Sequence, residues 1–113
     1  MGKQVRLRSV RNPAAARRQI NSIDQRIVRL LAKRTQIVRK IGAFKAEHGM
    51  PILQPEREKE LLAHKVELAK KTGLDPRFVT KFFSEVMAAS RAEQAKVQAK
   101  LKDRPHRRIG ARK

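Results

Sequence analysis

Residues 20–44, INSIDQRIVRLLAKRTQIVRKIGAF, decide the fold, because their apolar side chains recur with the spacing of a single helix. At about 100° per residue these side chains fall within one arc of roughly 140°. They are Ile20, Ile23, Ile27, Leu30, Leu31, Ile37, Val38, Ile41 and Phe44. With its flanks the pattern predicts a helix over about 13–48, roughly 50 Å long. Because that length does not fit a compact monomer of 113 residues, we expect the helix to pack against a second chain in an intertwined homodimer.

Two shorter helices are predicted after this one. Gly49 breaks the first pattern, and Pro55 suits the first turn of the second helix. Gly73 is expected just past the end of that helix, and Asp75 before Pro76 predicts the start of the third. The predicted ranges are about 55–71 and 76–100. No segment alternates like a strand, so we expect an all-α fold with a three-helix protomer.

The net charge of +19 raises a nucleic-acid-binding hypothesis, but much of the charge lies at the two ends. Residues 1–12 carry +4 and residues 100–113 carry +6, in segments with little apolar periodicity. We therefore expect one domain over 13–100 between basic tails, 1–12 and 101–113. Such tails bind polyanions at most without specificity.

The absence of cysteine excludes disulfides, thiolate metal sites and thiol catalysis. It also fits a reducing compartment, and no run of roughly 20 apolar residues predicts a membrane span. We expect a cytoplasmic protein. The short chain leaves no room for a fused second enzyme, so a monofunctional protein is expected.

Several polar residues fall where the helical patterns place the interior. Arg34 and Lys45 lie on the apolar side of the first helix, about 16 Å apart along its axis. Ser90 and Gln94 stack on one face of the third helix. Taken singly, each has a structural explanation: Arg34 would bridge to a carboxylate, and Lys45 would extend to solvent. Together they predict a cationic pocket for a small anion, since buried cations require a counter-charge.

The second helix adds Glu58 inside its apolar arc and Arg57 at the edge of that arc. Arg17 lies at the edge of the first arc, about 25 Å along the axis from Arg34. If Arg17 serves the same site, it must therefore come from the other protomer of an antiparallel pair. The set lacks a nucleophile with an adjacent base, a metal cluster and a phosphate-binding loop. We expect no metal and no cofactor, and a reaction driven by charge stabilisation and conformational restraint.

These motifs and their spacing resemble the all-helical class of chorismate mutases over residues 17 to about 98. The matching motifs are Arg17-x6-Asp24, Leu30-Leu31-x2-Arg34, Lys45, Arg57-Glu58 and Ser90-x3-Gln94. The resemblance implies an intertwined dimer with two equivalent sites, each receiving one arginine from the partner. It implies conversion of chorismate to prephenate, a concerted [3,3] rearrangement.

By that resemblance, the substrate-binding residues are Arg17, Arg34, Lys45, Gln54, Arg57, Glu58, Ser90 and Gln94. Arg17 of the partner subunit and Arg34 would hold the carboxylates with help from Ser90. Lys45 and Gln94 would donate to the ether oxygen, with Arg34 as the third catalytic residue. Glu58 would accept from the ring hydroxyl, and Arg57 would order that region. Gln54 stands where many relatives have Asp, and it would act through its side chain or its backbone.

Other functions remain open at this stage. An isochorismate-pyruvate lyase or an aminodeoxychorismate mutase on the same fold would keep Arg17, Arg34 and Lys45. A basic helical nucleic-acid-binding protein would explain the tails, but not two cations on the apolar side of a helix. A purely structural helical dimer would bind no dicarboxylate. The downstream pathway and any regulation by end products or a partner enzyme are not fixed by these residues.

Overall fold

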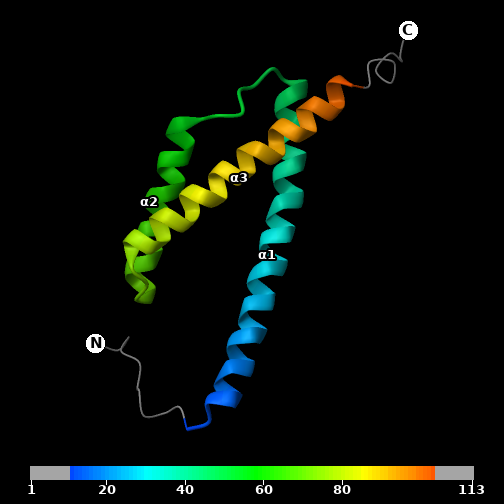
Figure 1. Ribbon diagram of the computed structural model, residues 1–113. Coiled ribbons are helices and arrows are strands. Elements are labelled where there is room, and N and C mark those ends of the chain that lie inside the picture. The colour runs from blue at the N-terminus through cyan, green and yellow to red at the C-terminus, as the bar shows by residue number, and fades with distance from the viewer. Residues whose placement is uncertain (1–10, 104–113) are drawn as a thin grey trace. The chain divides into compact units, whose positions relative to one another are not determined.

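The computed structural model describes residues 11–103, which form three helices (Figure 1). Helix α1 spans Pro13–Glu47, α2 spans Pro55–Thr72 and α3 spans Pro76–Lys102. No strand occurs in this part of the chain, so the all-α prediction is confirmed. The last two residues of α3 extend the third helix beyond the expected 100, into the segment assigned to the C-terminal tail. Of the two predicted tails, residues 1–10 and 104–113 lie outside the described residues.

Local capping explains where α1 begins and ends. The Oδ1 atom of Asn12 accepts hydrogen bonds from two backbone N–H groups of the first turn, at 3.0 and 3.3 Å. At the other end Gly49 has φ of 63°, a left-handed conformation that favours glycine. The N–H of Met50 then donates to the carbonyl oxygen of Lys45 over 2.8 Å, which closes the helix. The helix expected over about 13–48 is observed over 35 residues, Pro13–Glu47.

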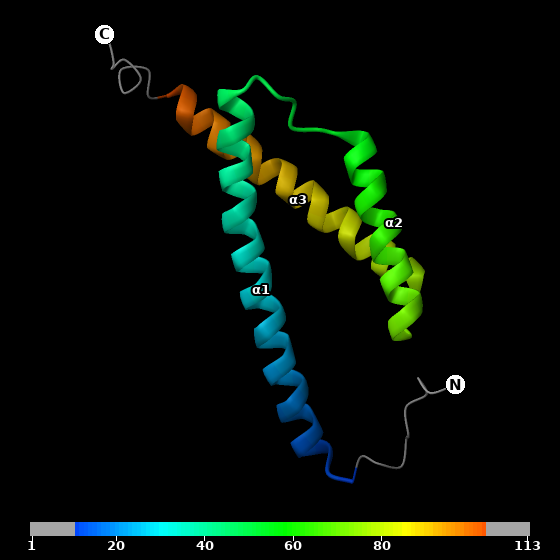
Figure 2. The same cartoon turned by 180° about the vertical axis from the view of Figure 1, so that it is seen from behind.

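Helices α2 and α3 are joined by a tight turn and lie side by side (Figure 2). Gly73, with φ of 82°, ends α2, and the Asp75 side chain accepts from the backbone N–H of Arg77 over 2.9 Å to begin α3. Ala69 of α2 and Val79 and Met87 of α3 are buried. This pair of helices supports the site described below.

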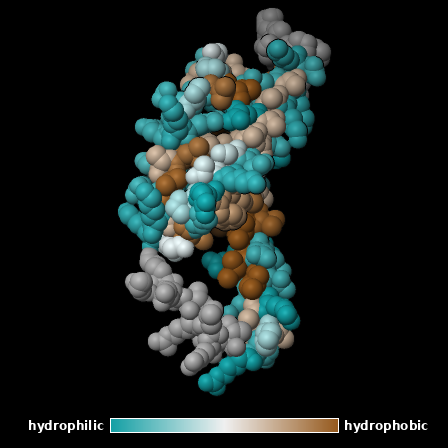
Figure 3. All heavy atoms as spheres, turned by 60° about the vertical axis from the view of Figure 1, so that its left-hand side comes forward, coloured by the Kyte–Doolittle hydropathy of each residue, from teal (hydrophilic) through white to brown (hydrophobic). Residues whose placement is uncertain are grey.

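The chain divides into two compact units, one up to Arg34 and one from Thr35 onward. Helix α1 supplies the first unit and its last turns belong to the second. In the first unit the predicted apolar arc is exposed, with Ile23 51% and Leu30 63% accessible. Apolar side chains are accordingly exposed on the surface of the single chain (Figure 3). The intertwined dimer and the single domain over 13–100 stay predictions.

Within residues 11–103, no helix combines the length and apolar content that crossing a bilayer requires.

Candidate functional site

Lys45 is the buried cation of the second unit, with 7% of its surface accessible. It lies in the last turn of α1, and its Nζ donates to the carbonyl oxygen of Ile52 over 3.0 Å. Burial lowers the pKa of the Lys45 ammonium below its ordinary value of 10.5, and the nearby negative charge of Glu58 opposes that shift. The predicted interior position of Lys45 is confirmed. An ammonium held in such a place is a strong donor toward an anion.

Gln94 of α3 is also 7% accessible, and it lies against the same part of α1. A Cβ atom placed on Gly42 would be only 3.0 Å from the Cα of Gln94, so the two helices approach closely there. Gly42 precedes Lys45 by three residues, which puts both on the face of α1 that meets Gln94. The Oε1 atom of Gln94 is buried without a hydrogen-bond partner among the described residues. Since an unpaired buried acceptor costs about 1–3 kcal/mol, such an atom is typical of a binding site.

Glu58 comes from the first turn of α2 and is half-buried. Both of its carboxylate oxygens lie 2.6 Å from Nη1 of Arg91 on α3. The same carboxylate acts on Lys45 through its charge. Glu58 therefore interacts with a cation of α3 by direct contact and with a cation of α1 through its charge.

Three more of the predicted residues lie in the second unit. Ser90 is half-buried, and its hydroxyl donates to the carbonyl oxygen of Val86 over 2.9 Å. Gln54 is half-buried at the N-cap of α2, where its side chain makes no capping hydrogen bond. Arg57 is exposed, with Nη1 3.9 Å from Oε1 of Glu60. Their roles toward a substrate stay predictions.

The two remaining predicted residues belong to the first unit. Arg17 is exposed on the second turn of α1, and Arg34 is half-buried. Because they are separated by roughly 25 Å along one helix, one protomer cannot bring both to the same small molecule. This distance is the reason for expecting Arg17 to serve the site of a partner subunit, which stays a prediction.

The sequence-based prediction missed two residues of this region, Arg91 and Gly42. Arg91 directly follows Ser90 and is three residues before Gln94, so the helical spacing already put it near the predicted face. Gly42 lies late in the first helix, and the apolar pattern does not single it out. Its close approach to Gln94 depends on the pairing of two helices that are distant in the sequence.

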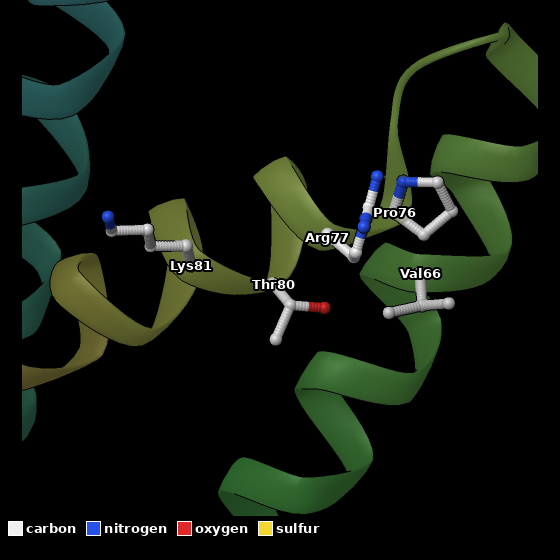
Figure 4. Close-up of a pocket in the computed structure, with 5 residues that line it drawn as sticks. All are labelled: Val66, Pro76, Arg77, Thr80 and Lys81. Atoms are coloured by element: carbon white, nitrogen blue, oxygen red, sulfur yellow. The ribbon is translucent and has the colours of Figure 1, made fainter.

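An open hollow elsewhere in this unit holds none of the predicted site residues. It is lined by Val66, Pro76, Arg77, Thr80 and Lys81 (Figure 4). Thr80 and Gln94 are 14 residues apart on α3, roughly 21 Å along the axis. The hollow is therefore not part of the region around Lys45.

The region around Lys45 combines a buried ammonium, a buried amide and a carboxylate contributed by three helices. Such a set can hold a small anionic molecule and donate hydrogen bonds to an oxygen that gains negative charge. Neither role requires these side chains to transfer a proton or to form a covalent bond. The geometry suits a rearrangement within one bound molecule.

Comparison with known proteins gives a consistent result. Residues 16–95 match the family described as chorismate mutase type II. A bifunctional chorismate mutase/prephenate dehydratase from Buchnera aphidicola subsp. Acyrthosiphon pisum is 39% identical over 75% of this chain and 22% of its own length. The T-protein of Enterobacter agglomerans is 38% identical over 67% of this chain and 20% of its own. The chain thus spans about a fifth of the length of these two relatives. A chorismate mutase from Methanocaldococcus jannaschii is 31% identical over 72% of this chain and 82% of its own.

Proposed function

Because the chain belongs to the chorismate mutase type II family, we propose that it converts chorismate to prephenate at the region around Lys45. The observation that carries the proposal is the burial of Lys45 beside the buried Gln94, on the faces where α1 and α3 meet. A structural lysine would extend to water, because desolvating an ammonium is unfavourable. Lys45 instead remains inside, where it donates to the carbonyl oxygen of Ile52 and has donors left for an anionic guest.

The reaction breaks the ether C–O bond of chorismate and forms a C–C bond in one concerted step. Negative charge grows on the ether oxygen as that bond breaks. Lys45 and Gln94 donate hydrogen bonds to this oxygen, and these bonds strengthen in the transition state. Arg34, Ser90 and the partner's Arg17 hold the two carboxylates and keep the substrate in its compact reactive shape. No metal or cofactor takes part in this scheme.

The position of Glu58 favours chorismate as the substrate over isochorismate and aminodeoxychorismate. Its half-buried carboxylate accepts a hydrogen bond from the ring hydroxyl, while Arg57 orders the surrounding region. Gln54, at the start of α2, contacts the same end of the ring through its side chain or backbone. Isochorismate and aminodeoxychorismate differ from chorismate in the ring substituents that these residues meet. Turnover of the three substrates, compared side by side, tests this preference.

The active form is a homodimer in which a second copy covers the apolar arc of α1. Four members of that arc are 44–63% accessible in the single chain: Ile20, Ile23, Ile27 and Leu30. Full burial of one such side chain is worth about 1.5–3 kcal/mol, so covering the arc is strongly favourable. A second copy in antiparallel orientation also brings its exposed Arg17 to the site. We place this dimer in the cytoplasm, consistent with a chain that has no cysteine.

The decisive experiment follows the loss of chorismate by its absorbance with purified protein. Lys45→Met keeps the volume of the side chain and removes its donor, and Lys45→Ala removes the whole chain. We expect kcat/KM to fall about 10²–10³-fold, or roughly 3–4 kcal/mol of transition-state stabilisation. Lys40→Met, an exposed lysine of the same helix, is the matched control and should keep normal turnover. A Lys45→Met protein that folds and retains more than a tenth of the wild-type kcat/KM contradicts the proposal.

A further inference from the structure

Arg91, which the sequence-based prediction did not include, forms an ion pair with Glu58, the carboxylate of the site. Arg91 of α3 has 34% of its side chain accessible, and Glu58 of α2 has 24%. Nη1 of Arg91 lies 2.6 Å from both carboxylate oxygens of Glu58. An arginine this close to both oxygens of a carboxylate makes a charge-assisted contact with it. The ion pair joins two helices at residues 33 positions apart in the chain.

Lys45 is the other cation near this carboxylate, yet it makes no ion pair with Glu58 among the described residues. Its Nζ donates to the carbonyl oxygen of Ile52 instead. The charge of Glu58 is nevertheless close enough to act on the Lys45 ammonium. The groups that act on this ammonium are thus the Ile52 carbonyl from the loop and the carboxylate of Glu58 from α2, which in turn contacts Arg91 from α3.

We propose that Arg91 is a positioning residue, which holds the Glu58 carboxylate on α3 so that Lys45 keeps donors available for the substrate. The role of Lys45 toward substrate rests on the proposed function. An ammonium has three donors, and the Ile52 carbonyl takes one of them. A carboxylate released from Arg91 would be free to turn toward Lys45, on whose ammonium its charge already acts. The ammonium would then be neutralised by the protein instead of by the substrate.

The same contact fixes the direction of Glu58. A carboxylate has about four lone-pair sites, and the two contacts with Nη1 leave the others open. Glu58 therefore stays able to accept a hydrogen bond from a ring hydroxyl while its charge is balanced by Arg91. One arginine thereby keeps two substrate-facing groups separate, although it need not touch the substrate itself.

The test compares Arg91→Leu, which removes the charge, with Arg91→Lys, which restores a cation. The first measurement is the NMR titration of ¹³Cε-labelled lysine, with the Lys45 signal assigned by its loss in Lys45→Met. We expect the titration midpoint of Lys45 to rise in Arg91→Leu, because an opposite charge moves closer and a like charge is removed. The Lys45 midpoint in Arg91→Lys should lie between those of the wild-type protein and Arg91→Leu.

The second measurement is kcat/KM for chorismate, which we expect to fall about tenfold in Arg91→Leu through a lower kcat and to recover in part in Arg91→Lys. Arg39→Leu is the matched control, because it also removes an arginine paired with a glutamate of α3, at 3.0 Å from Glu93. It should change neither the Lys45 titration nor kcat. In a Glu58→Gln background, where no carboxylate can move, Arg91→Leu should raise the Lys45 midpoint much less, whereas a merely structural role for Arg91 predicts the same rise in both backgrounds, from the lost like charge alone.

An unchanged Lys45 midpoint in Arg91→Leu overturns the proposal, and so does a raised midpoint with unchanged kcat. If Arg91→Leu does not fold, Arg91→Gln serves in the same comparison. The titration needs no substrate, so it decides the position of Glu58 even if the wild-type protein fails to consume chorismate. That failure would overturn the proposed function instead.

Discussion

The substitution Gly42→Ala tests the closest approach of two helices at the site. An added Cβ would lie 3.0 Å from the Cα of Gln94 and 3.1 Å from both its Cβ and its Cγ. Ordinary contacts between carbon atoms are about 3.5–4.0 Å. Rotation of the Gln94 side chain cannot relieve the contacts with Cα and Cβ. The backbone of α3 must therefore move by a few tenths of an ångström relative to the last turns of α1.

Two opposing effects set the change in stability. Alanine is favoured over glycine inside a helix by about 0.5–1 kcal/mol. Overpacking of a close contact costs about 1–3 kcal/mol. The expected result is a net loss of about 1–2 kcal/mol, or roughly 5–10 °C in Tm for a domain of this size. Because Gln94 moves with α3, kcat should also fall, by about tenfold for a displacement of this order.

The assay is thermal unfolding at one fixed protein concentration, since an oligomer makes Tm depend on concentration. Ala46→Gly is the control, because Ala46 is exposed on the same helix and reports the helix preference without a close neighbour. Turnover of chorismate is measured on the same samples. The reasoning is refuted if Gly42→Ala gains as much stability as Ala46→Gly loses and keeps normal turnover.

Two further predictions concern Lys45 and the dimer. Because burial depresses the pKa of Lys45, the unfolded chain binds its proton more tightly than the folded one. As pH rises from the depressed pKa toward 10.5, turnover should therefore fall, while the stability of the wild-type protein relative to Lys45→Met rises. Denaturant titrations and pH–rate profiles of both proteins measure these trends. Turnover and relative stability that change in the same direction would contradict the prediction. Ile27→Asp places a charge in the apolar arc of α1, where Ile27 is 44% accessible in the single chain. The Ile27→Asp protein should be monomeric and without turnover, whereas Arg26→Asp, at an exposed neighbour, should remain dimeric. Sedimentation analysis measures the oligomeric state. An active Ile27→Asp monomer would exclude a site shared between subunits.

Helix positions could be predicted from the sequence because their signals are local. Asn12, Gly49, Gly73 and Asp75 each act on backbone groups within a few residues, so the chain carries its own start and stop signals. The interior position of Lys45 followed from the same 3.6-residue period. Gln94 was found in this way too, as a polar residue on an apolar face.

Contacts between helices could not be predicted in this way. The pair formed by Arg91 and Glu58, the donation from Lys45 to Ile52 and the approach of Gly42 to Gln94 all depend on how helices rotate and cross. A period identifies a face, but it does not identify the residue that a given face meets. Arg91 therefore escaped notice although it lies between two residues that were identified.

Three helices, their ends and the apolar side of each can be read from the amino-acid sequence, because these follow from backbone capping and side-chain spacing within a few turns. Which cation pairs with Glu58, and how closely α3 approaches α1, depends on how the helices pack. The tertiary structure also revealed that the apolar arc of the first unit is exposed in one chain. The physical reason is that periodicity specifies which surface avoids water, whereas three-dimensional packing specifies what covers it.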